Sequence, residues 1–274
     1  MKKIIALMLS AAIAMGGVIS ANVCADEYEP YRCMGDSNGD KIVDGKDASD
    51  VLTMYSKSSV GKTAIASTLK QKCDVNCDGI IDGKDATDIL SYYSFTSVGG
   101  NAQPDTYYMK NMLKNGDKTA LINAAENLYD LAAFIANGYS MGTRFSLSNT
   151  EYIEKGGNHY NLVTDPKIKS MDDVYADCYS LFAEKSEIKI GDTRQSIGIL
   201  NHYVQGDNGK VYSLIGNRGS FFEQYEITGV KSITSNSVTF NVVCSYLWGT
   251  INDDFTLKIQ SDGTLKITEF RIPY

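Results

Sequence analysis

The spacing of apolar residues changes along the chain and divides it into parts with different secondary structure. In the stretch from 105 to 138, apolar residues recur at i, i+3 and i+4, which predicts helices with a break at 115–116. From residue 210 onward the apolar period is two, which predicts strands. Helices followed by strands predict an α+β domain over 105–274, with the helices packed on a curved antiparallel sheet. The strands are expected at 151–163, 211–215, 225–230, 237–248, 255–259 and 265–272.

Capping residues mark where several of these elements begin and end. Asp117 is the predicted N-cap of the second helix in this region, and Gly138 its predicted C-terminal stop. Ser170 is the predicted N-cap of a later helix over about 171–184, whose first turn is acidic. The Asp-Gly pair at 262–263 predicts a hairpin between the last two strands. The stretch 193–200 fits a helix and a strand equally well.

The beginning of the chain has a charged start followed by an apolar run over 4–19, which predicts a secretory signal peptide at 1–25. A membrane anchor is the alternative, but the apolar run is short for a span and is interrupted at Ser10, Gly16 and Gly17. We therefore expect a secreted, extracellular protein with no membrane span after signal cleavage.

Between these regions, a twelve-residue acidic pattern occurs twice, at 36–47 and at 74–85, with a spacing of 38 residues. Each copy has oxygen-bearing side chains at positions 1, 3, 5, 9 and 12, and a β-branched apolar residue at position 8. This spacing wraps a loop around one hard cation, with position 7 contributing its backbone carbonyl. The predicted ligands are Asp36, Asn38, Asp40, the carbonyl of Ile42, Asp44 and Asp47 in the first loop, and Asp74, Asn76, Asp78, the carbonyl of Ile80, Asp82 and Asp85 in the second.

Calcium is the expected ion because every ligand is a hard oxygen, so the sequence predicts two bound Ca²⁺. The alternative is a pair of solvated acidic turns, since Asp, Asn and Gly also form ordinary turns. The second copy has Gly79 at position 6, where the chain turns sharply, but the first has Lys41. A lysine at positive φ costs about 1 kcal/mol, so we expect the first loop to bind more weakly. Position 12 is Asp in both copies, where an EF-hand has Glu.

An amphipathic helix is predicted after each loop, and no helix has room to precede the first. This arrangement of loop and exiting helix, repeated, with Gly-Lys before each position-12 Asp, resembles a type I dockerin over about 33–97. The resemblance implies a small all-α module of paired calcium loop-helix motifs that binds a cohesin module of a cellulosome scaffold protein. It also implies pseudo-twofold symmetry and two possible binding orientations. The cohesin-contacting positions implied by the resemblance are Gly45, Lys46, Gly83 and Lys84.

The chain is thus expected to be multi-domain: a signal peptide at 1–25, a dockerin at 26–97, a Gly/Pro linker at 98–104 and a cargo domain at 105–274. The formal net charge of −7 gives no basic surface, so we expect no nucleic-acid partner. Six cysteines permit disulfides in a secreted protein, but their pairing is open. A bridge beside the loops, among Cys33, Cys73 and Cys77, is one possibility. A bridge between Cys178 and Cys244 is another.

The cargo domain contains no catalytic motif that we can identify, so its catalytic residues are unknown and its being an enzyme is uncertain. Cys178 with His159 or His202 could form a thiol–imidazole pair, but Cys178 lies on an apolar helix stripe and is better explained as core. Aromatic residues could form a platform that stacks on sugars, although packing explains them as well. These aromatic residues are Tyr107, Tyr108, Tyr152, Tyr160, Tyr175, Tyr179, Tyr203 and Trp248.

A second, weaker resemblance covers roughly 150–274. The order of strand, Ser-capped helix, Asn-Gly turn at 208–209 and final hairpins is similar to secreted inhibitors of cell-wall DL-endopeptidases from Gram-positive bacteria. This resemblance implies a cargo domain that binds and blocks a hydrolase. A carbohydrate-binding module and an unrecognised polysaccharide-degrading enzyme are the alternatives. The expected protein is a secreted cellulosome component, held at the cell surface through its scaffold, with a hydrolase or polysaccharide as the second partner.

Overall fold

The protein is described from a computed structural model over residues 33–59, 67–190, 193–196, 202–216, 222–247 and 249–271. The predicted signal peptide at 1–25 lies outside these residues. The chain forms two compact units: Met1–Asn127 with Ser261–Thr264, and Leu128–Gln260 with Leu265–Tyr274. This division differs from the boundary predicted at 98–104. No helix in the described residues combines the length and apolar character that crossing a membrane requires.

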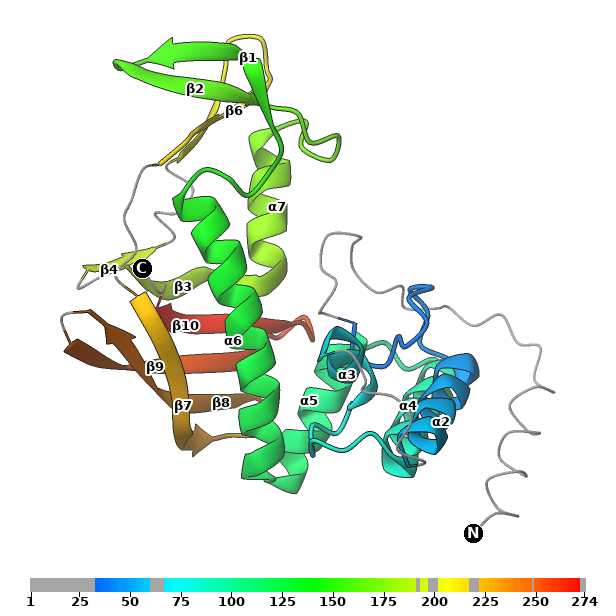
Figure 1. Ribbon diagram of the computed structural model, residues 1–274. Coiled ribbons are helices and arrows are strands. Elements are labelled where there is room, and N and C mark those ends of the chain that lie inside the picture. Colours follow the sequence, from blue (N-terminus) through cyan, green and yellow to red (C-terminus); the bar gives the residue numbers. More distant parts are fainter. Residues whose placement is uncertain are drawn as a thin grey trace. The chain divides into compact units, whose positions relative to one another are not determined.

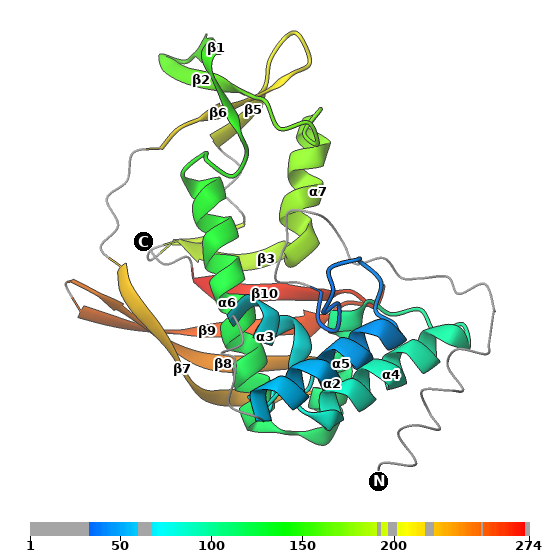
Figure 2. The ribbon, with the colours of Figure 1, turned by 45° about the vertical axis from the view of Figure 1, so that its right-hand side comes forward.

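The described part of the first unit is helical outside its loops. Helices α2 (Gly45–Ser59) and α4 (Gly83–Ser97) follow the two repeated loops, and α3 (Ser67–Cys73) precedes the second loop. Figures 1 and 2 both show α2 and α4 side by side. Helix α5 (Pro104–Asn115) comes next, followed by the start of α6 (Lys118–Ser140).

The segment predicted to be a linker forms a turn between α4 and α5. The N–H groups of Gly99 and Gly100 donate to the carbonyls of Thr96 and Phe95 at 3.0 Å each, which closes the end of α4. A Cβ on Gly100 would lie 2.5 Å from the ring of Phe95, so no larger residue fits there without a shift. Pro104 starts the next helix, where its missing N–H is tolerated. Glycine and proline at 98–104 therefore serve a tight turn.

An aromatic cluster holds α5 against α4 within the first unit. The ring of Tyr92 on α4 lies 5.2 Å from that of Tyr107 and 5.8 Å from that of Tyr108, both on α5. Tyr92 is 2 % exposed, and its hydroxyl donates to the carbonyl of Ala102 at 3.0 Å. Phe95 adds a further ring 5.2 Å from Tyr107. Burial of these rings makes α5 part of the same packed unit as the loops.

The second unit contains two sheets, a helix that follows β2 in the sequence, and the part of α6 beyond Asn127. The four-stranded sheet has the order β1-β2-β6-β5 and the six-stranded sheet β4-β3-β10-β9-β8-β7. All neighbours pair antiparallel except β3 and β10, which are parallel, whereas the sequence predicted an antiparallel sheet. The elements are β1 (Leu147–Lys155), β2 (Asn158–Val163), α7 (Met171–Leu181), β3 (Phe182–Ile190), β4 (Thr193–Ser196), β5 (Tyr203–Gln205), β6 (Val211–Leu214), β7 (Phe222–Ile233), β8 (Ser237–Tyr246), β9 (Gly249–Ile259) and β10 (Leu265–Arg271).

The part of α6 beyond Asn127 packs on the six-stranded sheet, as Figure 1 shows. The buried ring of Tyr129 lies 4.2 Å from Tyr225, 5.1 Å from Phe255 and 4.9 Å from Phe270, on three different strands. Its hydroxyl donates to the carbonyl of Arg271 at 3.1 Å. The apolar stripe predicted for this helix therefore covers the sheet.

The capping predictions were partly confirmed. Asp117 accepts hydrogen bonds from the first turn of α6, and Ser170 forms a capping box at the start of α7. Gly138 does not end α6, which continues to Ser140; a Cβ there would lie 3.1 Å from the Cα of Arg144. The glycine is therefore needed for close packing. Helix α7 ends at Leu181, earlier than predicted, because β3 begins at the next residue.

Candidate metal centre

The same pattern of hydrogen bonds occurs within each of the two repeated loops. In each, the backbone N–H groups of positions 5, 7, 9 and 11 donate to the side chains of positions 3, 5, 12 and 9. The lengths are 2.7, 3.0, 2.8 and 2.7 Å in the first loop and 2.8, 3.0, 2.9 and 2.6 Å in the second. The repeat in the sequence is thus a repeat in local structure, because the same side chains fold the same backbone.

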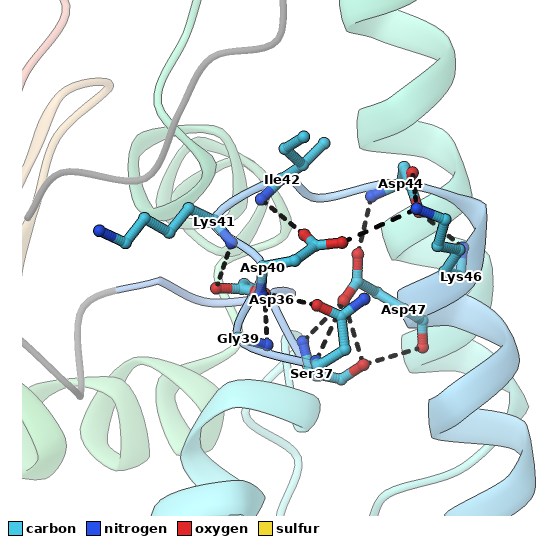
Figure 3. A network of polar contacts seen from close by, with 10 residues as sticks. Asp36, Ser37, Gly39, Asp40, Lys41, Ile42, Asp44, Lys46 and Asp47 are labelled. Atoms are coloured by element: carbon cyan, nitrogen blue, oxygen red, sulfur yellow. Dashed lines mark hydrogen bonds and ion pairs between the residues drawn. The ribbon is translucent and has the colours of Figure 1, made fainter. Parts of the chain in front are cut away.

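The predicted ligands of the first loop lie on one short segment and gather around its interior. Figure 3 shows the carboxylates of Asp36, Asp40 and Asp47 turned inward, while the side chains of Lys41 and Ile42 point away. Like charges this close repel one another unless a cation lies between them. The first loop thus carries its predicted oxygen donors on one short segment, with Ile42 able to offer only its carbonyl.

The position-12 carboxylates are the most buried members of the two loops. Asp47 and Asp85 are both 0 % exposed. Burial raises the pKa of Asp47 to about 6 and that of Asp85 to about 7, although hydrogen bonds from backbone N–H groups act in the opposite direction. Among the described residues, no lysine or arginine forms an ion pair with either carboxylate. A divalent cation would supply the missing positive charge.

One buried oxygen of the second loop has no hydrogen-bond partner among the residues that the structure describes. Oδ1 of Asp74, at position 1, is buried and accepts no hydrogen bond. An unsatisfied buried carboxylate oxygen is costly, and a metal ion is one way to satisfy it. The donor set contains only oxygen, which suits calcium.

A search restricted to the described residues finds no group of three or more His, Cys, Asp or Glu side chains that could hold a metal. The four aspartates predicted as ligands in each loop therefore do not form such a group in this structure, and the predicted set also includes one asparagine and one backbone carbonyl. Calcium accepts this mixture of oxygen ligands in flexible geometry.

Backbone strain is present in both loops, which corrects the sequence-based comparison between them. Lys41 has φ 70°, as expected for position 6. In the second loop, however, Cys77 at position 4 has φ 55°, where the first loop has Gly39 at φ 77°. Each loop therefore has one non-glycine residue in the left-handed region, so Lys41 gives no reason for a weaker first site. Aligning the two copies at position 4 would have revealed this.

The residues predicted to contact cohesin lie at the exposed starts of α2 and α4. The side chains of Lys46 and Lys84 are 73 % and 69 % exposed. Nζ of Lys84 lies 3.1 Å from Oδ2 of Asp78, a contact that raises the pKa of the lysine. A Cβ on Gly45 or Gly83 would meet no atom within 4 Å, so both glycines border open space.

A hollow of about 800 Å³ lies beside the second copy. It is lined by Lys84 and Asp88 of α4 and by residues of α5 that include Lys114. The pKa of Asp88 is raised by burial, and then by the nearby charge of Asp78. The start of α4 therefore borders a hollow that it shares with α5.

The cysteines do not form the bridges considered from the sequence. Cys73, Cys77, Cys178 and Cys244 are buried free thiols, whereas Cys33 is disulfide-bonded. The prediction of a Cys178–Cys244 bridge is therefore wrong. So is the prediction of a bridge among Cys33, Cys73 and Cys77. Buried thiols behave as small apolar side chains and need no partner.

The residues considered for catalysis in the second unit have other roles. Cys178 is fully buried, and burial raises its pKa to about 12, opposite to what an activated thiol requires. Nδ1 of His202 lies 3.0 Å from the carbonyl oxygen of Leu214. His159 stacks on Tyr152 with ring centroids 3.7 Å apart. The hypothesis of a thiol–imidazole pair gains no support.

The tyrosines considered for sugar binding are divided between core and surface. Tyr108, Tyr160 and Tyr203 are buried, while Tyr152 and Tyr175 are 52 % and 39 % exposed. Trp248 lies outside the described residues. Packing accounts for the buried tyrosines.

Comparison with known proteins adds no family to this chain. No protein-family model matches it, and a search of curated proteins finds no match.

Proposed function

We propose that the two loops each bind one Ca²⁺ ion and that the module they organise docks onto a cohesin module of an extracellular scaffold. In this proposal, side chains at positions 1, 3, 5, 9 and 12 and the position-7 carbonyl hold the ion. Calcium supplies positive charge that offsets the repulsion among the carboxylates and the cost of burying those at position 12.

The observation that carries the proposal is the buried position-12 carboxylate in each loop. Asp47 and Asp85 each accept backbone hydrogen bonds in equivalent places and have no cationic side chain beside them among the described residues. A solvated acidic turn gives no reason to bury a carboxylate twice at the same position of a repeat. The unsatisfied oxygen of Asp74 supports the same conclusion.

The docking surface in this proposal is formed by the starts of α2 and α4. Gly45 and Gly83 leave the surface open, and Lys46 and Lys84 present exposed ammonium groups beside them. Because the two copies have the same local structure, each could meet the partner in turn. This part of the proposal relies on the dockerin resemblance of the loop sequences.

Calcium binding is tested by isothermal titration of the full chain, with circular dichroism in chelator and in calcium. We expect two sites, and a rise in helical signal when calcium is added. Asp40→Ala should remove the first site and Asp78→Ala the second, whereas Asp207→Ala, on an exposed turn of the second unit, should leave both. No binding by the unmodified protein, or loss of neither site in the two loop variants, would refute the proposal.

For the region 105–274 we propose a binding role, with inhibition of a cell-wall DL-endopeptidase as the first activity to test. The motifs that support this appear in the expected chain order: β2, the Ser170-capped α7, the turn at 208–209 and the β9–β10 hairpin. Adding the full chain to a peptidoglycan DL-endopeptidase should slow hydrolysis in proportion to its concentration. Unchanged hydrolysis, together with retention on insoluble polysaccharide, would favour the carbohydrate-binding alternative.

A further inference from the structure

A side chain from α6 contacts the backbone of the second loop. Nδ2 of Asn123 donates to the carbonyl oxygen of Cys77 at 2.7 Å, across 46 residues of sequence and within the first unit. Cys77 is at position 4, is 3 % exposed and has φ 55°. Residues other than glycine adopt this left-handed conformation only when their surroundings hold them there.

This contact fixes one peptide plane between two predicted ligands. The carbonyl of Cys77 and the N–H of Asp78 belong to the same peptide group. The carbonyl accepts from Asn123, and the N–H donates to Oδ1 of Asn76 at 2.8 Å. The plane is therefore held at both ends, and its orientation sets how the side chains at positions 3 and 5 face the loop interior.

The first loop has no equivalent support and needs less. Its position 4 is Gly39, at φ 77°, and glycine adopts this conformation without steric strain. Among the described residues, none donates a hydrogen bond to the carbonyl of Gly39. At position 4, the described residues thus show a non-glycine residue together with side-chain support in the second loop, and glycine without such support in the first.

We propose that Asn123 is a positioning residue for the second metal site and that it couples occupancy of that site to the start of α6. The inference rests on the proposed calcium binding. It adds to that proposal by assigning part of the second site to α6, a helix outside the repeat. Supporting groups that orient ligands without touching the metal commonly change affinity about 10-fold to 100-fold when they are removed.

The test is calcium titration of the full chain carrying Asn123→Ala or Asn123→Asp, using CaCl₂ as the only ligand. We expect the second site to weaken by about 10-fold or more, and the first by no more than about twofold. The matched control is Asn127→Ala, one turn later on the same helix. Oδ1 of Asn127 accepts a 3.0 Å hydrogen bond from Nε2 of Gln71 on α3, and no bond from Asn127 to the second loop is present in the described part of the chain, so the second site should keep its affinity.

A second experiment separates positioning from general destabilisation of α6. If Asn123 acts by holding Cys77 in its left-handed conformation, Cys77→Gly should recover part of the affinity lost in Asn123→Ala. Equal loss with and without Cys77→Gly would overturn the inference, as would unchanged affinity in both Asn123 variants. If the unmodified chain bound no calcium at all, the proposed calcium function would fail instead.

Hydrogen exchange keeps the inference testable even if the Asn123 variants fail to fold. Adding calcium should protect the amides of 120–127 in Asp40→Ala, which keeps the second site. The same amides should gain no protection in Asp78→Ala, which lacks that site. Equal protection in the two variants would mean that α6 does not respond to the second site in particular, and would overturn the proposed coupling.

Discussion

Calcium binding should depend steeply on pH, and differently at the two loops. Asp47 and Asp85 are fully buried, and burial raises the pKa of the first to about 6 and of the second to about 7. Only the ionised carboxylate binds the metal, so protons compete with calcium for each loop. Lowering the pH from 8 to 5 is therefore a perturbation that needs no mutation.

The magnitude follows from the fraction of each group that is ionised. At pH 8 both carboxyls are almost entirely ionised. At pH 5 the ionised fraction is about one in ten for a pKa of about 6, and about one in a hundred for a pKa of about 7. The apparent affinity should therefore fall about 10-fold at the first loop and about 100-fold at the second.

The assay is titration calorimetry with CaCl₂ at pH 8, 7, 6 and 5 in the full chain. Repeating each titration in two buffers with different ionisation enthalpies counts the protons that calcium releases. Asp40→Ala and Asp78→Ala each isolate one loop, so that the two pH profiles can be measured separately. Affinities that stay flat between pH 8 and 5 would refute the reasoning, as would a steeper fall at the first loop.

The same shifts predict how stability in chelator depends on pH. Both folded-state pKa values lie above the ordinary value of 3.8, so the folded protein binds these protons more readily than the unfolded chain. Stability should consequently rise as the pH falls from about 7 to about 4. For Asp85 the rise in pKa from 3.8 to about 7 limits this gain in stability to about 4 kcal/mol. Urea unfolding in chelator at pH 5 and at pH 7.5 measures whether the free energy of unfolding is larger at the lower pH.

Three further predictions concern other parts of the molecule. The buried hydroxyl of Tyr108 has no hydrogen-bond partner in the described part of the chain, so Tyr108→Phe should raise the free energy of unfolding in urea by about 1 kcal/mol. Tyr92→Phe loses a hydrogen bond to a carbonyl and should lower the free energy of unfolding by about as much. Arg271→Met leaves a buried carboxylate on β9 without its guanidinium and should cost about 3 kcal/mol in urea unfolding. Lys46→Glu and Lys84→Glu should each preserve cohesin binding through the other copy, and the double variant should lose it in titration calorimetry; a single variant as weak as the double would mean one fixed orientation.

The loop geometry was the part of the candidate site most open to prediction from sequence. Its hydrogen bonds join residues two to ten positions apart, so the spacing of Asp and Asn already determines most of them. The caps at Asp117 and Ser170 were predictable for the same reason. The support that Asn123 gives to Cys77 was not, because it joins residues 46 positions apart and neither belongs to a motif.

The fold prediction failed where a residue type that usually marks the end of an element serves tertiary packing instead. Gly138 reads as a helix stop, but the chain uses its missing side chain to bring Arg144 close. The glycines at 99 and 100 read as part of a linker between domains, but they close a turn between two packed helices. Strand β3 was missed because 182–190 follows a helix directly, without a turn residue between them.

The position of α5 bears on how the calcium module should be delimited. Its buried face consists of Thr106, Tyr108, Met109 and neighbouring residues, and its rings pack against Tyr92 of α4. Oδ1 of Asp105 also accepts a hydrogen bond from the N–H of Met34, just before the first loop, at 3.0 Å.

A fragment ending at 97 would expose the face of α4 that these contacts bury. Burial of a large aromatic side chain contributes about 2 kcal/mol, so the loss would be a substantial part of a small module's stability. The smallest chain that tests calcium-dependent folding fairly should therefore retain α5 and the part of α6 that carries Asn123.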